Sequence, residues 1–167
     1  NRLVEEYMLL ANYLVAQRLV THAKDRACLR RHPPPVMESM DKVAAVAKEA
    51  MNFNIDIASS QTLQESLMRL REECPDPLIM DCVTQMMTLP MQQAIYFAAG
   101  SEDPSEWRHF ALNMPYYTHF TSPIRRYPDV IVHRLLQATL EGEEAVENYP
   151  QNSKQIQQVC EHCTEKQ

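Results

Sequence analysis

The chain has 167 residues, of which 45% are apolar and 23% charged, and this suits one soluble domain large enough to bury most of its apolar side chains. It contains two glycines, Gly100 and Gly142, so neither of the common glycine-rich phosphate-loop patterns can be written. The formal net charge of −6 argues against a generic nucleic-acid coat. The odd number of cysteines favours a reduced, intracellular protein, and the uncharged stretch 82–101 is too polar to predict a membrane span.

Hydrophobic spacing predicts helices through the first ninety residues. Leu3, Tyr7, Leu10 and Leu14 recur at steps of three and four, which predicts a first helix from about Leu3 to Thr21. The other elements expected in this part are an extended polyproline stretch at 33–35, helices over Met37–Met51, Thr62–Arg71 and Leu78–Met87, and a loop over 52–60.

The pattern changes after residue 93. Ala94–Ala98 is short and β-prone, and Trp107–Phe120 is rich in aromatic and β-forming residues, so we predict that these two segments form a hairpin-like strand pair. Two further helices are expected, one from Pro123 to about Leu140 and one over Ser153–Glu165. The predicted fold class is mixed α/β (α+β), mainly helical with a short antiparallel strand pair.

Basic residues concentrate in two islands of this acidic chain. The stretch from Arg18 to His32 holds five basic residues and one acidic residue, Asp25. The stretch from Trp107 to Leu140 holds four arginines and one acidic residue, Asp129. Such islands suit a local anionic ligand, while two ordinary solvated faces remain the alternative.

The segment from Ser122 to Arg126 is the strongest candidate for chemistry. A helix capped by Ser122 and opened by Pro123 presents free backbone N–H groups, which attract anions. Arg125 and Arg126 then lie in the first turn, where the helix dipole disfavours positive charge. The pattern therefore predicts a phosphate clamp, because guanidinium groups match phosphate geometry bidentately. Pairing of the arginines with carboxylates elsewhere is the alternative.

Two weaker candidates lie in the first island and before it. Glu5 and Asn12 are seven residues apart and share one stripe of the first helix, where they could hold sugar hydroxyls or orient an arginine. Simple solvent exposure is the alternative. Arg30 and Arg31, held stiffly before the prolines, are a second candidate for contact with a nucleic-acid backbone, against an ordinary surface loop.

Two titratable pairs favour structural roles. Asp129 and His133 lie one helical turn apart, which indicates structural hydrogen bonding more than an acid–base pair. Cys160 and Cys163 share a helix face, but a closed zinc site needs four ligands and no second such pair accompanies them. The acidic pairs of the chain do not resemble a nest for a divalent metal.

Three motifs in order carry a family resemblance. The run Thr121–Tyr127 (TSPIRRY), followed by Asp129 and by His133-Arg134, resembles the signature of the RNase II (RNB) family of exoribonucleases. The run Leu3–Asn12 resembles the helix that precedes it in that family. The runs Leu29–Pro35, Tyr96–Gly100 and His109–Asn113 resemble the eukaryotic, cytoplasmic, exosome-independent branch that degrades uridylated RNA.

The resemblance implies hydrolytic 3′-to-5′ degradation of single-stranded RNA to nucleoside 5′-monophosphates, with magnesium held by an aspartate cluster. In the family that cluster lies upstream of these motifs and OB-type barrels flank the domain. Residues 1–167 are accordingly expected to be most of the C-terminal half of an RNB catalytic domain. The full-length protein is expected to be a monomer that does not associate with a membrane. A non-catalytic RNA-binding or protein-interaction fragment is the alternative.

The resemblance also implies roles for individual residues. Arg125 matches the catalytic arginine at the scissile phosphate, and Glu5 matches the acidic residue near the 3′-terminal nucleotide. The other expected RNA contacts are Asn12, Arg30, Arg31, His119, Thr121, Ser122 and Arg126.

Overall fold

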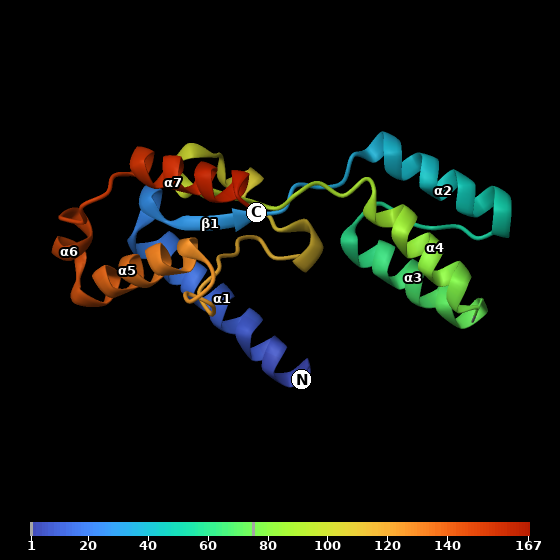
Figure 1. Cartoon of the computed structure of the whole chain (residues 1–167), viewed down its shortest axis with the longest axis horizontal. Helices are drawn as coiled ribbons and strands as arrows, with labels where there is room; N and C mark the ends of the chain where they lie inside the picture. The colour runs from blue at the N-terminus through green and yellow to red at the C-terminus, as the bar shows by residue number, and fades with distance from the viewer. Residues whose placement is uncertain (1, 75) are drawn as a thin grey trace. The chain divides into compact units, whose positions relative to one another are not determined.

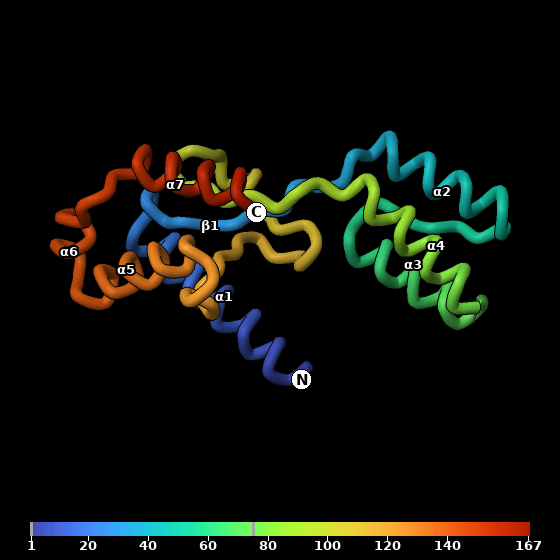
Figure 2. Tube along the Cα trace, viewed as in Figure 1, coloured from blue at the N-terminus to red at the C-terminus, as the bar shows by residue number. Residues whose placement is uncertain are grey.

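A computed structural model describes residues 2–74 and 76–167, and the chain divides into two compact units (Figures 1 and 2). Unit 1 comprises Asn1–His32 and Ala94–Gln167, and unit 2 comprises Pro33–Gln93. No helix within the described ranges has both the length and the apolar character needed to cross a bilayer.

Unit 1 is built around a two-stranded antiparallel sheet. Strand β1 (Cys28–Arg31) pairs with β2 (Ile95–Ala98), so that Cys28 faces Ala98 and Arg31 faces Ile95. The helices of this unit are α1 (Arg2–His22), α5 (Tyr127–Glu141), α6 (Glu143–Glu147) and α7 (Ser153–Glu165), with short 3₁₀ turns at Lys24–Arg26, Ala99–Ser101, Pro104–Glu106 and Phe110–Leu112. In Figure 1, α7 runs along one side of β1, and α1 and α5 lie on the other.

The core of unit 1 joins segments that are far apart in the sequence. Leu19 of α1, Leu29 and Phe97 of the sheet, Ile131 of α5 and Ile156 of α7 are all almost fully buried in one cluster. Burial of apolar surface at this junction stabilises the unit. It also holds α5 behind the turn that carries part of the candidate site, and it holds the C-terminal half of α1.

The predicted class, mainly helical with a short antiparallel strand pair, is confirmed, but the predicted partner of the second strand was wrong. Trp107–Phe120 forms no strand. Pro115 interrupts it, Phe110–Leu112 is a 3₁₀ turn, and the backbone of His109 pairs with Met114 a few residues on. Strand β2 pairs instead with Cys28–Arg31, and in the sequence the whole of unit 2 lies between these two strands. Local propensity does not reveal a pairing with so large an intervening insertion.

The predicted start of the long helix near the C-terminus was also wrong. Helix α5 begins at Tyr127, and the residues from Ser122 to Arg126 form a turn in which the Arg125 and Arg126 N–H groups donate to the Ser122 carbonyl. A helix beginning at Pro123 would place Pro128 in its interior, without an N–H and in collision with the carbonyl four residues earlier. Pro128 instead occupies the first turn of α5, where proline is tolerated.

Unit 2 is a small three-helix unit with its own core. Its helices are α2 (Met37–Met51), α3 (Ser60–Glu73) and α4 (Pro77–Thr88), all at positions that the sequence predicted. Ser59 caps α3 in a reciprocal hydrogen-bond pair with Thr62, and the Asp76 side chain caps α4. Met40, Leu63, Leu70, Val83 and Met87 form the core of the unit.

Candidate nucleic-acid interface

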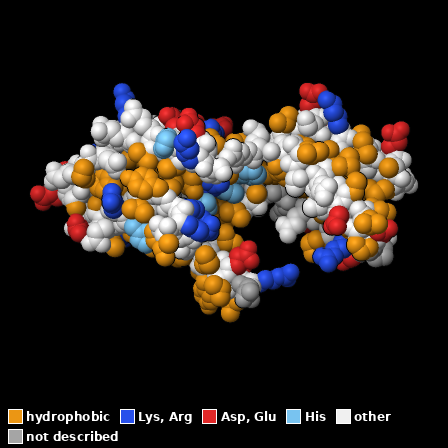
Figure 3. Space-filling model, viewed as in Figure 1, with side chains coloured by type: hydrophobic (Ala, Val, Ile, Leu, Met, Phe, Trp, Pro, Cys, Tyr) orange, Lys and Arg blue, Asp and Glu red, His pale blue; other side chains and the backbone are white. Residues whose placement is uncertain are grey.

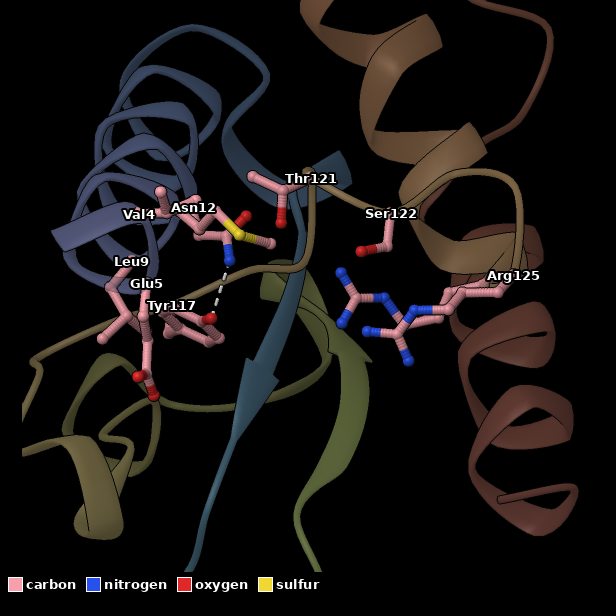
Figure 4. Close-up of a pocket in the computed structure, with 10 residues that line it drawn as sticks. Val4, Glu5, Leu9, Asn12, Tyr117, Thr121, Ser122 and Arg125 are labelled. Atoms are coloured by element: carbon pink, nitrogen blue, oxygen red, sulfur yellow. Dashed lines mark hydrogen bonds between the residues drawn. The ribbon is translucent and has the colours of Figure 1, made fainter. Parts of the chain in front are cut away.

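A pocket of about 410 Å³ in unit 1 brings together most of the predicted site. Six of the nine predicted residues line it, while Arg30, Arg31 and His119 do not. The lining residues are Val4, Glu5, Met8, Leu9 and Asn12 of α1, Tyr117 and Thr121 of the loop that leads to the turn, and Ser122, Arg125 and Arg126 of the turn before α5. Figure 4 shows Arg125 extending from the turn on one side, with Glu5 and Asn12 on α1 at the other side and the Asn12 amide directed at the Tyr117 hydroxyl.

Asn12 joins α1 to the loop that carries the signature motif. Its side-chain Nδ2 donates to the Tyr117 hydroxyl at 2.7 Å, and its Oδ1 accepts from the Phe120 backbone N–H at 2.9 Å. The residue is 4% exposed. The expected alignment of Glu5 with Asn12 on one stripe is therefore confirmed by their shared pocket, and the Asn12 amide is engaged within the protein. A direct contact of Asn12 with RNA stays a prediction.

Replacing Asn12 by alanine should lower the free energy of unfolding by about 2 kcal/mol, because a buried hydroxyl and a buried backbone N–H both lose their partner. Chemical denaturation of this chain measures the change. Glu6→Ala on the exposed side of α1 is the matched control and should change stability by less than about 0.5 kcal/mol. Equal effects of the two substitutions would contradict the bridging role of Asn12.

The turn before α5 holds its two arginines in different environments. Arg126 donates from Nε and Nη2 to the Asp129 carboxylate at 2.8 and 2.7 Å, and Asp129 is fully buried. Arg125 is exposed at the pocket. Within residues 2–74 and 76–167, its side chain has no hydrogen-bond or ion-pair partner. Of the two interpretations of the sequence, pairing with a carboxylate is confirmed for Arg126. Arg125 has no such pairing among the described residues, and its contact with a phosphate stays a prediction.

The expected supply of free helix N–H groups at Ser122 and Pro123 is absent from this turn, since α5 begins later. The Ser122 N–H donates to Asp129 at 2.8 Å. Asp129 also lies in the first turn of α5, where the helix dipole favours a negative charge. Free N–H groups at Ser122 and Pro123 therefore do not support the predicted phosphate clamp, and the exposed guanidinium of Arg125 is the group of this turn that remains a candidate for it.

Asp129 and His133 both have structural hydrogen bonds, although not with each other. The Nε2 atom of His133 lies 2.9 Å from the Phe120 carbonyl oxygen, and the two rings stack with their centroids 4.2 Å apart. The sequence interpretation of structural roles is confirmed, with different partners. Both contacts hold the loop 117–122 against α5.

A cluster of aromatic and histidine rings lies beside the pocket. Nδ1 of His119 and the hydroxyl of Tyr96 are 2.7 Å apart, and the Tyr117 ring meets the His119 ring edge-on. Burial first, and then the charges of Arg126 and Arg30, lower the pKa of His119 to about 3. His119 is therefore neutral at pH 7, so it can exchange hydrogen bonds with a ligand but does not serve as a cationic proton donor.

Arg30 and Arg31 of β1 have separate surroundings. Arg31 pairs with Glu102 at 3.1 Å and with Glu106 at 3.4 Å. Arg30 lies over the Tyr96 ring, 4.6 Å from its centroid, and donates to Gln167. Desolvation by burial lowers the pKa of Arg30 from its usual value. A contact of Arg30 and Arg31 with a nucleic-acid backbone stays a prediction. The charge of Arg31 is already compensated by the carboxylates of Glu102 and Glu106.

The described residues do not fit a magnesium site. Glu5 is the one carboxylate that lines the pocket, and Asp129 is taken up by Arg126 and Ser122. Across the described ranges, no three His, Cys, Asp or Glu side chains converge in a way that could hold a metal. Magnesium prefers near-octahedral oxygen coordination, with carboxylates among its protein ligands.

Sequence reasoning missed Tyr117 as a pocket residue and Asp129 as the partner of Arg126. Tyr117 carries a signal that could have been used, because it stands two residues before His119 in the aromatic run leading to the motif. Asp129 follows Arg126 by three residues, which is a spacing at which ion pairs form once a helix begins between them. Because α5 begins at Tyr127, between the two residues, this spacing brings the Arg126 guanidinium to the Asp129 carboxylate.

Basic side chains on the face shown in Figure 3 form small separate groups among acidic and hydrophobic ones. A long basic groove is therefore not what this face offers.

Comparison with known proteins gives the family. Residues 1–142 match the RNB domain. DIS3-like exonuclease 2 of Caenorhabditis elegans is 43% identical over 166 residues, which is 99% of this chain and 19% of that protein. The chain thus spans about a fifth of the length of this relative.

Two solved structures share the fold. Yeast Ssd1, described as a pseudonuclease, matches with a TM-score of 0.80 and 28% identity over 96% of this chain and 19% of that one. Mycoplasma genitalium RNase R, solved in complex with double-stranded RNA, matches with a TM-score of 0.63 and 25% identity over 98% of this chain and 30% of that one. The match over residues 1–142, carrying the loop and turn that build the pocket, places the chain in the RNB-domain family of ribonucleases.

Proposed function

We propose that this chain is the phosphate-holding part of a 3′-to-5′ exoribonuclease that hydrolyses single-stranded RNA to nucleoside 5′-monophosphates. The observation that carries the proposal is the environment of Arg125. This arginine is exposed at a pocket in an RNB domain and has no carboxylate partner among the described residues, while its neighbour Arg126 is neutralised. The similarity to an exonuclease of Caenorhabditis elegans supports the same class of activity.

The side chains of the pocket suit one end of an RNA strand. The guanidinium of Arg125 can donate two parallel hydrogen bonds to a phosphate, and it can follow the charge that develops on the phosphate oxygens during hydrolysis. Glu5 offers carboxylate oxygens to ribose hydroxyl groups from the opposite wall. These contacts address the sugar–phosphate backbone and not the base, so we expect weak sequence preference.

Magnesium belongs to this proposal only as an ion held by residues outside this chain. When bound at such a place it would supply an activated water for hydrolysis. The part assigned to the residues described above is to hold and orient the scissile phosphate.

A non-catalytic RNA-binding protein is the second candidate. The resemblance of the fold to the pseudonuclease Ssd1 favours it, because this fold persists in a protein described as lacking nuclease activity. RNase R, solved with bound RNA, supports RNA as the ligand under either candidate.

The test is a digestion of single-stranded RNA by the full-length protein, with label at the 5′ end or at the 3′ end in parallel reactions. Exonuclease action from the 3′ end releases labelled mononucleotide at once from the 3′-labelled strand, and a ladder of shortening products from the 5′-labelled strand. Retention of both labels on intact RNA, with binding observed by gel shift, would favour the non-catalytic candidate.

We further propose the exosome-independent branch, with 3′-uridylated RNA as substrate, a cytoplasmic location and a monomeric protein. The support is the resemblance of the runs Leu29–Pro35, Tyr96–Gly100 and His109–Asn113 and the similarity to DIS3-like exonuclease 2. Equal RNA bodies ending in oligo(U) or oligo(A) provide the test. Faster degradation of the oligo(U) substrate is expected, and equal rates would contradict the uridylation preference.

A further inference from the structure

One buried carboxylate gives the two adjacent arginines of the signature motif different environments. Asp129 is 0% exposed and accepts three hydrogen bonds. Two come from Arg126 as a bidentate pair, and the third comes from the Ser122 backbone N–H. Burying a carboxylate costs free energy unless a nearby positive charge compensates it. The burial of Asp129 therefore requires Arg126 to remain paired with it.

The same carboxylate closes the turn that displays Arg125. It ties the first residue of the turn, Ser122, to the first turn of α5, while the Ser122 carbonyl accepts from the N–H groups of Arg125 and Arg126. Both ends of the turn are therefore fixed at one point in the protein interior. The Arg125 side chain is the cationic group of this turn left exposed at the pocket.

We propose that Asp129 is a positioning residue: it retains Arg126 as an internal counter-ion and thereby presents Arg125 alone to the phosphate of the RNA. This inference rests on the proposed function for the identity of the ligand, and on the geometry of the turn for the choice between the two arginines. Arg126 in this view needs only to neutralise Asp129.

The first experiment is independent of nuclease activity. Phenylglyoxal reacts with accessible guanidinium groups, and peptide mass mapping reads the two arginines separately. In the wild-type chain, Arg125 should react at least tenfold faster than Arg126. In Asp129→Asn, which keeps the shape of the side chain but loses its charge, the two rates should come within about threefold. Equal rates in the wild-type chain, or an unchanged ratio in the variant, would overturn the positioning role.

The second experiment uses kinetics of the full-length enzyme. Asp129→Asn should lower kcat for single-stranded RNA at least tenfold with less than a threefold change in KM, because the phosphate is bound but poorly aligned. Adding Asp129→Asn to Arg125→Ala should cause little further loss, since both changes remove the same contact. Losses that multiply would show that Asp129 does not act through Arg125.

Two more variants guard against a merely structural effect. The double variant Arg126→Gln with Asp129→Asn replaces the ion pair by an amide pair, and it should recover at least threefold in kcat over Asp129→Asn alone. Failure of this rescue would mean that Arg126 itself contacts the substrate. Asp41→Asn, exposed on α2, is the matched control and should leave both the phenylglyoxal ratio and kcat unchanged. If the wild-type enzyme has no nuclease activity, the proposed function fails while the phenylglyoxal ratio still decides the role of Asp129.

Discussion

Replacing Arg125 by alanine in the full-length enzyme should lower kcat by on the order of a hundredfold or more while changing the affinity for single-stranded RNA by less than about threefold. The reason is that one guanidinium among many backbone contacts adds little to ground-state binding. At the scissile phosphate, however, it meets charge that grows in the transition state. Arg125 is suited to this because its guanidinium is not engaged by a carboxylate in the described parts of the chain.

Single-turnover rates and equilibrium binding to the same oligonucleotide measure the two quantities separately. Arg125→Lys should also lose most of the activity, because an ammonium group keeps the charge but cannot form the paired hydrogen bonds of the guanidinium. Arg134→Ala, exposed on α5, is the matched control and should retain the wild-type rate. A loss of affinity with turnover preserved would assign Arg125 to binding and refute its catalytic role.

Acidification from pH 7 to pH 5 should destabilise the chain by about 2–4 kcal/mol through His109 and His119 together. Burial first, and then the charges of His32 and Arg30, lower the pKa of His109 to about 4, and burial with Arg126 and Arg30 lowers the pKa of His119 to about 3. Both rings are neutral in the folded chain across this range. In the unfolded chain they take up protons as the pH falls through about 6.5.

The sign of the effect follows from that difference. The unfolded state binds more protons than the folded state below about pH 6.5, so the free energy of unfolding falls as the pH falls. Each histidine contributes about 1–2 kcal/mol at pH 5 after allowance for its partial exposure to solvent. The stability is fully present well above pH 6.5 and is lost progressively as the pH falls from 6.5 toward the folded pKa values of about 4 for His109 and about 3 for His119.

Denaturation midpoints at pH 7 and pH 5 provide the measurement. His109→Gln and His119→Gln should each flatten the pH dependence, because glutamine does not titrate. His162→Gln, exposed on α7, is the control and should leave it in place. A pH dependence that is unchanged in the double variant His109→Gln, His119→Gln would contradict the neutral state of these rings.

The candidate site was accessible from the sequence because its parts are local. The turn from Ser122 to Arg126 is a contiguous motif, and Glu5 and Asn12 are related by the simple periodicity of one helix. The structure adds that α1 and the turn line one pocket. The helices of unit 2 were likewise predicted from the spacing of apolar residues.

Two errors came from local signals that compete with more distant ones. Ser122 and Pro123 form a good helix start by themselves, but Pro128 five residues later cannot lie inside that helix. Trp107–Phe120 has the composition of a strand, but β2 finds a better partner in Cys28–Arg31, where Leu29 and Phe97 enter the core together. In both cases packing overrides propensity, as it does generally for strands.

The sequence by itself determined where the long helices lie, the family and the residues that could meet a phosphate, because hydrophobic period and motif spacing act within a few turns of chain. The tertiary structure decided which of the two arginines is free. That choice depends on the burial of Asp129, which requires α5 to pack on α1 and the sheet. A buried carboxylate must be compensated by the nearest cation, and only the folded core makes Asp129 buried and Arg126 the nearest.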